Sequence, residues 1–529
     1  MKPQDREVIR NLVRERLVTE LADKKRGRAD FVENTIQETL YLERQRLRDI
    51  RSHAETSAEA RFYKDVQKRR LAQSQDDREA IAALVDHYTA EIVGNFSERV
   101  YRFSTAVIPF GLAFLLKAQT PKRLIHDFPH LDAIENQLIV QGELEHVRQL
   151  MKRGTLIFTP THLSNLDSII MGYSIFRAGM PPVIYGAGIN LFENKLIGYF
   201  MHHLGAYKVD RRKKDWLYIR TLKEYATVSM ELGYNNLFFP GGTRSRSGEV
   251  ETKLKLGLLG CGLRAYINNL KAQKAEPRVF VIPVNINMAL CLEAETLIND
   301  YLRITGGSRY IIVDDEFSRP GRIASYFKNL FNMDSKITVT FGRGLDPFGN
   351  RVDDEGRSLD PNGRILDVAR YTWVRGVPEV DEERDQQFTR DLGEQVVGQL
   401  LAHNVILATN VAAFAVFQLM RREFPNLDLY RLIRLGAREF SRAQVIEMIA
   451  RVMDELRRLE RRGGILLGDN LAQADAAAIL DRALHMFRTF HFSQAISEED
   501  GRIFPQDTNL IFYYQNRLTH YGLEKQVAL

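Results

Sequence analysis

Two side chains able to move a proton lie close together in residues 155–170, whose sequence is TLIFTPTHLSNLDSII. His162 and Asp167 are five positions apart, so on one continuous helix they would lie roughly 140° apart and could not meet. If His162 lies in a loop and Asp167 opens a helix, the carboxylate can fold back onto the imidazole. Asp167 would then hold one ring nitrogen while the other takes a proton from a hydroxyl, so this arrangement would make a general base.

The surrounding residues predict a strand, a loop and a helix, since an apolar run ends at Pro160 and helical spacing resumes after Asp167. Between about Pro121 and Pro347, apolar runs alternate with amphipathic segments, which predicts an α/β layer with a largely parallel sheet. Sites in such a layer gather at the carboxyl ends of strands, where His162 is expected. The expected strands are 156–159, 183–185, 207–209, 237–239, 279–284, 310–313 and 337–341.

Helical regions are expected on both sides of this layer. Residues 1–100 carry an apolar stripe at helical spacing on a highly charged background, and we interpret them as scaffold. After a connection rich in Gly, Asp and Pro, the chain is again mainly helical. We therefore expect a charged helical region at 1–100, an α/β domain at 101–350 and a mainly helical region at 351–529.

Composition excludes a multi-span membrane protein, because 44% of the 529 residues are hydrophobic and 27% are charged. Apolar stretches at 103–116 and 405–420 are too short to span a bilayer. Basic flanks leave shallow interfacial insertion open for the first, and the second is expected to be a buried helix. Cys261 and Cys291 form no disulfide framework or thiol metal site, and the start has no apolar leader, so we expect a reducing cytoplasmic compartment.

Basic residues gather near Lys152, at 211–214 and at 244–255, although the formal net charge is only +6. Any one cluster is explained by a solvated surface. Three clusters flanking one candidate site favour an anionic substrate or an anionic lipid surface, and charge alone leaves nucleic acid open.

Three further segments could complete a site. Residues 205–211, GAYKVDR, predict a short strand that leads to Arg211. Residues 237–248, LFFPGGTRSRSG, predict a strand followed by a Gly-Gly loop, in which an arginine could bind phosphate bidentately. This loop lacks the spacing and lysine of a P-loop, which excludes ATP or GTP binding there. Residues 279–286, VFVIPVNI, predict a buried strand that Pro283 interrupts.

In this order and spacing, the four segments resemble the four motif blocks of the membrane-bound glycerol-3-phosphate acyltransferase family. The blocks are a His and an Asp with four residues between them, a glycine-to-arginine block, a Gly-rich block with an arginine, and a proline within an apolar strand. The resemblance covers about 147–347. A weaker likeness to the bacterial branch returns at 513–520, YYQNRLTH, and residues 1–100 are uncovered.

The resemblance implies transfer of a fatty acyl group from acyl-CoA or acyl carrier protein to glycerol 3-phosphate, in phospholipid biosynthesis at the cytoplasmic face of the cell membrane. It implies no nucleic acid partner, no metal and no cofactor beyond the thioester co-substrate. Lysophosphatidate or dihydroxyacetone phosphate are alternative acceptors. A catalytically weak relative that binds membrane lipid is a further alternative.

Within the resemblance, His162 would deprotonate the acceptor hydroxyl and Asp167 would orient the imidazole. Transfer is direct between two bound substrates, so Ser164 is not expected to act as a nucleophile. The residues expected to bind substrate are Arg211, Gly242, Thr243, Arg244, Ser245 and Pro283.

One departure from the family concerns the third block, where relatives usually have Glu-Gly and this chain has Gly241 followed by Gly242. The missing glutamate bears on the identity of the acceptor more than on the class of reaction. Glu249 and Glu251 are candidates to replace it.

Overall fold

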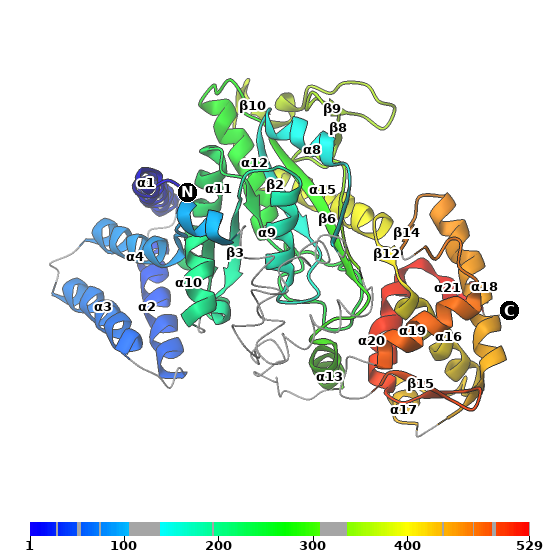
Figure 1. Ribbon diagram of the computed structural model, residues 1–529. Helices are drawn as coiled ribbons and strands as arrows, with labels where there is room; N and C mark the ends of the chain where they lie inside the picture. Colours follow the sequence, from blue (N-terminus) through cyan, green and yellow to red (C-terminus); the bar gives the residue numbers. More distant parts are fainter. Residues whose placement is uncertain are drawn as a thin grey trace.

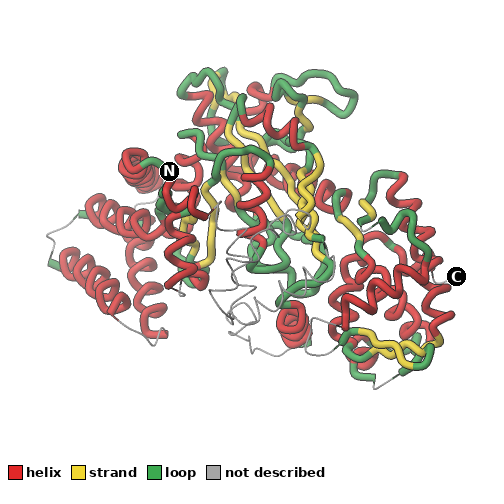
Figure 2. The backbone as a smooth tube through the Cα atoms, viewed as in Figure 1, coloured by secondary structure: helices red, strands yellow, loops and turns green. Residues whose placement is uncertain are grey.

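The computed structural model describes residues 1–27, 30–49, 54–72, 76–104, 138–192, 195–306, 336–435, 438–468, 470–488 and 494–527. A central sheet lies between N-terminal helices on one side and C-terminal helices on the other (Figures 1 and 2). The strand expected at 310–313 and nearly all of the apolar stretch 103–116 fall outside the described residues.

The central sheet has seven strands in the order β1-β7-β6-β2-β5-β3-β4. All neighbouring strands run parallel except β6 and β7, which confirms the expected α/β class with a largely parallel sheet. The strands are β1 (Leu138–Gly142), β2 (Thr155–Pro160), β3 (Ile184–Gly188), β4 (Ala206–Val209), β5 (Asn236–Leu237), β6 (Val279–Met288) and β7 (Ile337–Phe341).

β1 was not expected from the sequence, and two of the expected strands differ in form. The sequence predicted that Pro283 interrupts its strand, but β6 continues through it to Met288. The reason is that Pro283 lies just before the ladder with β7 begins at Val284, so its missing N–H breaks no pair in that ladder. β5 ends at Leu237, earlier than expected, although the Phe238 N–H still donates to the Phe158 carbonyl at 3.2 Å.

Helices cover both faces of β2, which is buried along its whole length. Leu156 and Phe158 belong to one hydrophobic core, while Ile157 belongs to another with residues of α11 and α12, as strand alternation requires. The helices of this layer are α8 (Leu144–Met151), α9 (Asp167–Arg177), η2 (Ile189–Phe192), α10 (Lys195–His203), α11 (Trp216–Glu231), α12 (Leu256–Lys271) and α13 (Ala294–Thr305).

The N-terminal helices are α1 (Pro3–Gly27), α2 (Phe31–Asp49), α3 (Ala54–Leu71) and α4 (Asp77–Ile92). The expected apolar stripe of α1 is buried at Ile9, Val13 and Leu17. These side chains share a core with Tyr218 and Tyr225 of α11. The N-terminal region therefore packs directly against the α/β layer.

The C-terminal region shares its hydrophobic core with β6, so it also packs against the sheet. Its central helix, α16, is buried along most of its length, which confirms the expected buried helix near 405–420. Within the described residues, no helix is both long enough and apolar enough to cross a membrane. The helices are α15 (Glu382–Ala402), α16 (Ala408–Glu423), α17 (Leu429–Ile433), α18 (Arg442–Arg461), α19 (Ala476–Arg488), α20 (Thr508–Gln515), η5 (Asn516–Tyr521) and α21 (Leu523–Val527).

Short strands that the sequence did not predict accompany these helices. Their bounds are β8 (Arg351–Val352), β9 (Ser358–Leu359), β10 (Trp373–Val374), β11 (Val377–Pro378), β12 (Val405–Ile406), β13 (Phe440–Ser441), β15 (Ile496–Glu499) and β16 (Arg502–Pro505). One short strand at 465–467 was expected, and β14 (Leu466–Leu467) occupies it.

Candidate active site

His162 lies in the loop between β2 and α9, and Asp167 is the first residue of α9, as the sequence predicted. The Nδ1 atom of His162 is 3.0 Å from Oδ2 of Asp167. The same carboxylate oxygen accepts the backbone N–H groups of Leu163 at 2.6 Å and Ser164 at 2.8 Å. Asp167 therefore fixes both the loop and the imidazole, and Nε2 remains the nitrogen that can take a proton from a substrate.

The loop of the third block holds His162 from three directions. The imidazole stacks on Phe239, with 4.0 Å between ring centroids. The His162 carbonyl accepts the Ser245 N–H at 2.7 Å, and the His162 N–H donates to Oε1 of Glu251 at 2.7 Å. These contacts leave the His162 side chain 13% exposed and join the first and third sequence blocks in one site.

The surroundings favour the neutral form of His162. Burial lowers the pKa of the imidazole, and the positive charges of Arg244 and Arg211 lower it further, although Asp167 acts in the opposite direction. The net shift is downward from 6.5, so the ring is unprotonated at neutral pH. A neutral imidazole is the form that a general base needs.

Arg244 is oriented by a carboxylate that the sequence did not single out. Its Nη1 is 3.2 Å from Oε1 of the fully buried Glu293. Glu293 also accepts the Ser164 hydroxyl at 2.7 Å and the Asn165 N–H at 3.0 Å. The Ser164 hydroxyl is thus bonded to a carboxylate, in keeping with the expectation that it is not a nucleophile. The signal for Glu293 was its place five residues beyond the end of β6, at the edge where sites gather.

Arg211 reaches the same edge of the sheet from the end of β4. Loss of hydration lowers the pKa of its guanidinium, and the charges of Arg246 and Arg244 lower it further. Since Arg211 and Arg244 also act on His162, positive charge from two loops converges beside the imidazole. Such a cluster can bind a phosphate that lies next to the proton acceptor.

The remaining predicted binding residues differ in how they relate to this centre. Gly242 has φ +76°, and a Cβ there would lie 2.8 Å from Cγ of Lys255, so the turn requires glycine. Thr243 is exposed, while the Ser245 hydroxyl is bonded to the Glu249 carbonyl at 2.8 Å. Pro283 is buried within β6 beside Thr159, before the catalytic end of the sheet. A role of these residues in substrate binding stays a prediction.

Glu251 lies where a side chain at position 241 would project. A Cβ on Gly241 would be 2.9 Å from Cγ and 3.5 Å from Oε1 of Glu251. Burial raises the pKa of Glu251 to about 7, although its bond from the His162 N–H and the charge of Arg517 act to lower it. Glu249 is instead directed to His520, with 3.6 Å between their nearest atoms. Of the two candidate replacements for the missing glutamate, only Glu251 contacts His162.

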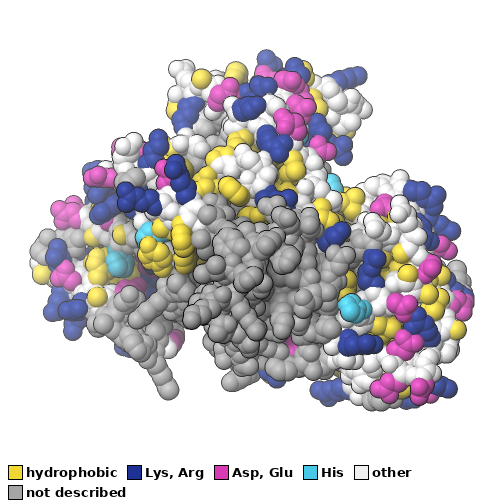
Figure 3. Space-filling model, viewed as in Figure 1, with side chains coloured by type: hydrophobic (Ala, Val, Ile, Leu, Met, Phe, Trp, Pro, Cys, Tyr) yellow, Lys and Arg dark blue, Asp and Glu magenta, His cyan; other side chains and the backbone are white. Residues whose placement is uncertain are grey.

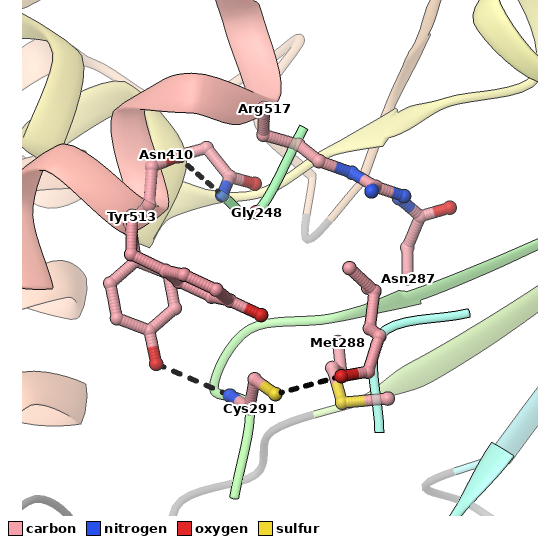
Figure 4. A pocket seen from close by; sticks show the side chains of 9 residues that line it. Gly248, Asn287, Met288, Cys291, Asn410, Tyr513 and Arg517 are labelled. Atoms are coloured by element: carbon pink, nitrogen blue, oxygen red, sulfur yellow. Dashed lines mark hydrogen bonds between the residues drawn. The ribbon is translucent and has the colours of Figure 1, made fainter. Parts of the chain in front are cut away.

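The C-terminal segment that weakly resembled the bacterial branch packs against the third-block loop of this site. Tyr513 and Arg517 line a small pocket together with Gly248 of the third-block loop, as Figure 4 shows. Asn516 donates to the Ser247 carbonyl at 2.9 Å. Arg517 is buried, and its charge acts on Glu251. No role for Arg517 was predicted from the sequence, because it is 232 residues away from Asn285 of β6, to which its guanidinium donates at 3.2 Å.

The protein surface bears on the expected contact with anionic lipid. On the face in Figure 3, Lys and Arg side chains are mixed with Asp and Glu. Phe103 and Tyr199 are 54% and 51% exposed, and the ring of Phe103 stacks on Phe200. Lys213, one of the expected basic cluster, is buried and therefore does not belong to a basic surface. Contact with a membrane stays a prediction.

The sheet and the His-Asp site define the class of protein. Residues 139–287, which include the sheet strands around His162 and Asp167, match the family described as Acyltransferase. This match agrees with the α/β fold and with the family resemblance that the four sequence blocks predicted.

Related proteins carry a more particular name. The chain is 27% identical over 281 residues to the glycerol-3-phosphate acyltransferase of Pseudomonas paraeruginosa, covering 53% of this chain and 29% of the relative. The chain is 26% identical over 384 residues to the protein of that name from Pseudomonas fluorescens, covering 72% of this chain and 40% of the relative. It is 32% identical over 158 residues to the protein of that name from Aeromonas hydrophila, covering 30% of this chain and 19% of the relative. The predicted resemblance is thus confirmed, and the chain spans less than half the length of these relatives.

Proposed function

We propose that the protein transfers a fatty acyl group from a thioester, acyl-CoA or acyl carrier protein, to the hydroxyl of glycerol 3-phosphate. The observation that carries this proposal is the neutral His162, held by Asp167 and flanked by Arg211 and Arg244. A phosphate on the two arginines would bring the neighbouring hydroxyl of a small acceptor to Nε2 of His162. The names of the relatives support glycerol 3-phosphate as this acceptor.

In the proposed reaction, the acceptor hydroxyl gives its proton to Nε2 of His162 as its oxygen attacks the thioester carbonyl. The tetrahedral intermediate collapses, its carbon–sulfur bond breaks, and the thiolate leaves. The proton held by His162 then passes to that thiolate, so the products are the ester and the free thiol. The cytoplasmic membrane face is the proposed location, because the product is a lipid.

A donor and acceptor panel tests this function. We expect the purified chain to acylate glycerol 3-phosphate from palmitoyl-CoA or from palmitoyl acyl carrier protein, measured as labelled acyl chain recovered in lipid. Lysophosphatidate and dihydroxyacetone phosphate serve as competing acceptors, since each also carries a phosphate and a hydroxyl. Glycerol is the control without phosphate. Background rates with every donor and acceptor would show that the chain is no acyltransferase, and a preference for another phosphorylated acceptor would correct the substrate.

We further propose that Glu251 replaces the family glutamate absent at position 241. Glu251→Gly should lower kcat about tenfold, because the His162 backbone loses its buried acceptor. Gly241→Glu should also lower it, since the new side chain would meet Glu251. The double exchange should be more active than either single variant, with a coupling of about 1–3 kcal/mol.

A control and the size of the loss in the double variant decide this exchange experiment, which uses the same labelled assay. Glu249→Ala is the matched control, because it removes a nearby carboxylate that faces His520 instead of His162. If the rise in activation free energy of the double variant equals the sum of the rises in the two single variants, positions 241 and 251 do not share one role.

A further inference from the structure

The loop that carries Arg211 is attached to the N-terminal helices by three of its six side chains. Residues 210–215 have the sequence DRRKKD, in which Asp210, Lys213 and Asp215 are buried. Arg211, Arg212 and Lys214 between them are exposed. The buried set therefore faces the N-terminal helices, and the exposed set stays in contact with solvent.

Lys213 is the deepest of these attachments, with 1% of its side chain exposed. Its Nζ atom donates to Glu59 of α3 at 3.0 Å and to Glu91 of α4, and lies 3.9 Å from Glu43 of α2. It also lies over the ring of Tyr88, 4.9 Å from the centroid. One lysine of the α/β layer thus binds carboxylates from three different N-terminal helices.

These carboxylates form a cation site that the chain fills with its own ammonium group. Glu59, His87 and Glu91 offer ligand atoms within 4.8 Å of one another, as a metal site would require. Lys213 bonds to both glutamates, and burial together with its positive charge lowers the pKa of His87 to about 4. The three carboxylates outweigh the effect of burial on Lys213 and raise its pKa, so the lysine stays charged.

Two further contacts hold the ends of the loop. Asp210 lies 3.9 Å from Arg46 of α2, whose guanidinium also bonds to Glu43 at 2.6 Å. Asp215 accepts the Thr39 hydroxyl at 3.2 Å and the Tyr88 hydroxyl at 3.3 Å. Asp215 also caps α11 by accepting the N–H of Tyr218 at 2.9 Å. The loop is therefore fixed at its start, its middle and its end.

We propose that helices α2 to α4 position the Arg211 loop, with Lys213 as the positioning residue, so that Arg211 meets the phosphate of the acceptor. Arg211 is two residues from Lys213, and its guanidinium itself remains outside the carboxylate cluster. Residues 1–100 thereby have a function in acceptor recognition besides that of scaffold. This proposal rests on the proposed function for the identity of the ligand.

Lys213→Met and Lys214→Met form a matched pair that tests the proposal, since both remove one positive charge from the same loop. Calorimetric titration with glycerol 3-phosphate should show a Kd raised about tenfold or more in Lys213→Met and within about twofold of native in Lys214→Met. The KM for acyl-CoA should be unchanged in both. Hydrogen exchange of the backbone amides of 206–216 should accelerate in Lys213→Met and stay as in the native protein in Lys214→Met.

A second variant guards against misfolding, because removing Lys213 leaves buried carboxylates without their counter-ion. Glu91→Gln alters the partner on α4 and keeps Lys213 in place. It should raise Kd and accelerate exchange of the loop, both by less than Lys213→Met does. Unchanged Kd in Lys213→Met and Glu91→Gln, or faster exchange of the loop without a change in Kd, would overturn the proposal. Binding of glycerol 3-phosphate is measured without turnover, so a failure of acyl transfer alone would contradict the proposed function and not the role of Lys213.

Discussion

Replacing His162 with alanine is expected to lower kcat for acyl transfer about 10²–10⁴-fold, the range typical of losing a general base. The variant keeps the backbone bonds to Glu251 and Ser245, so the loop should stay in place. What it loses is the nitrogen that takes the proton from the acceptor. The KM for the acyl donor should therefore change little.

The pH profile gives this prediction a second readout. A protonated imidazole cannot accept a proton, so the native rate should rise with pH as His162 loses its proton. Because burial lowers the pKa below 6.5, the rate should already be level at neutral pH, and His162→Ala should lack this rise. His485→Ala, at an exposed position on α19, is the control. A His162→Ala rate close to native would exclude His162 as the base.

Replacing Arg244 with alanine is expected to lower kcat/KM for the acceptor about 10²-fold, or about 2.7 kcal/mol, mainly through a higher acceptor KM. The guanidinium is held by the buried Glu293 and lies beside Arg211, so its loss removes both charge and geometry at the phosphate. Arg244→Lys should recover only part of the loss, because an ammonium cannot bind bidentately.

Steady-state kinetics with varied glycerol 3-phosphate and saturating acyl-CoA measure this effect. Lys253→Ala is the control, since it removes an exposed positive charge from the same region of the chain. Thermal unfolding of Arg244→Ala should be compared with native, because Glu293 loses its counter-ion. An acceptor dependence equal to that of native protein would remove Arg244 from the phosphate site.

Much of the fold follows from local pattern, as the strands around the site illustrate. β2 and β6 are largely apolar runs, because strands that are covered on both faces have no solvent-exposed face for polar side chains. β5 and the short strands of the C-terminal region were mispredicted or missed, because two to four residues give no periodicity to read. The effect of Pro283 was mispredicted for a related reason. A proline breaks a strand only where the neighbouring strand needs its N–H as a donor, and this depends on how the strands pair.

Sequence alone determined the chemistry available to this protein. The His162–Asp167 spacing, with a strand before it and a helix after it, limited how the two side chains could meet. The order of the four blocks indicated the family that the chain resembles. These features are local or fixed by chain order, so they can be recognised from the sequence without a structure.

Tertiary structure alone decided which distant residues serve that chemistry. Glu251 fills the space beside Gly241, Glu293 orients Arg244, and Arg517 returns from the far end of the chain to face Glu251. Lys213 was read as surface charge and is instead buried among carboxylates of the N-terminal helices. The physical reason is that burial and ion pairing depend on distances between segments, and a charged residue has the same letter whether it faces water or a buried partner.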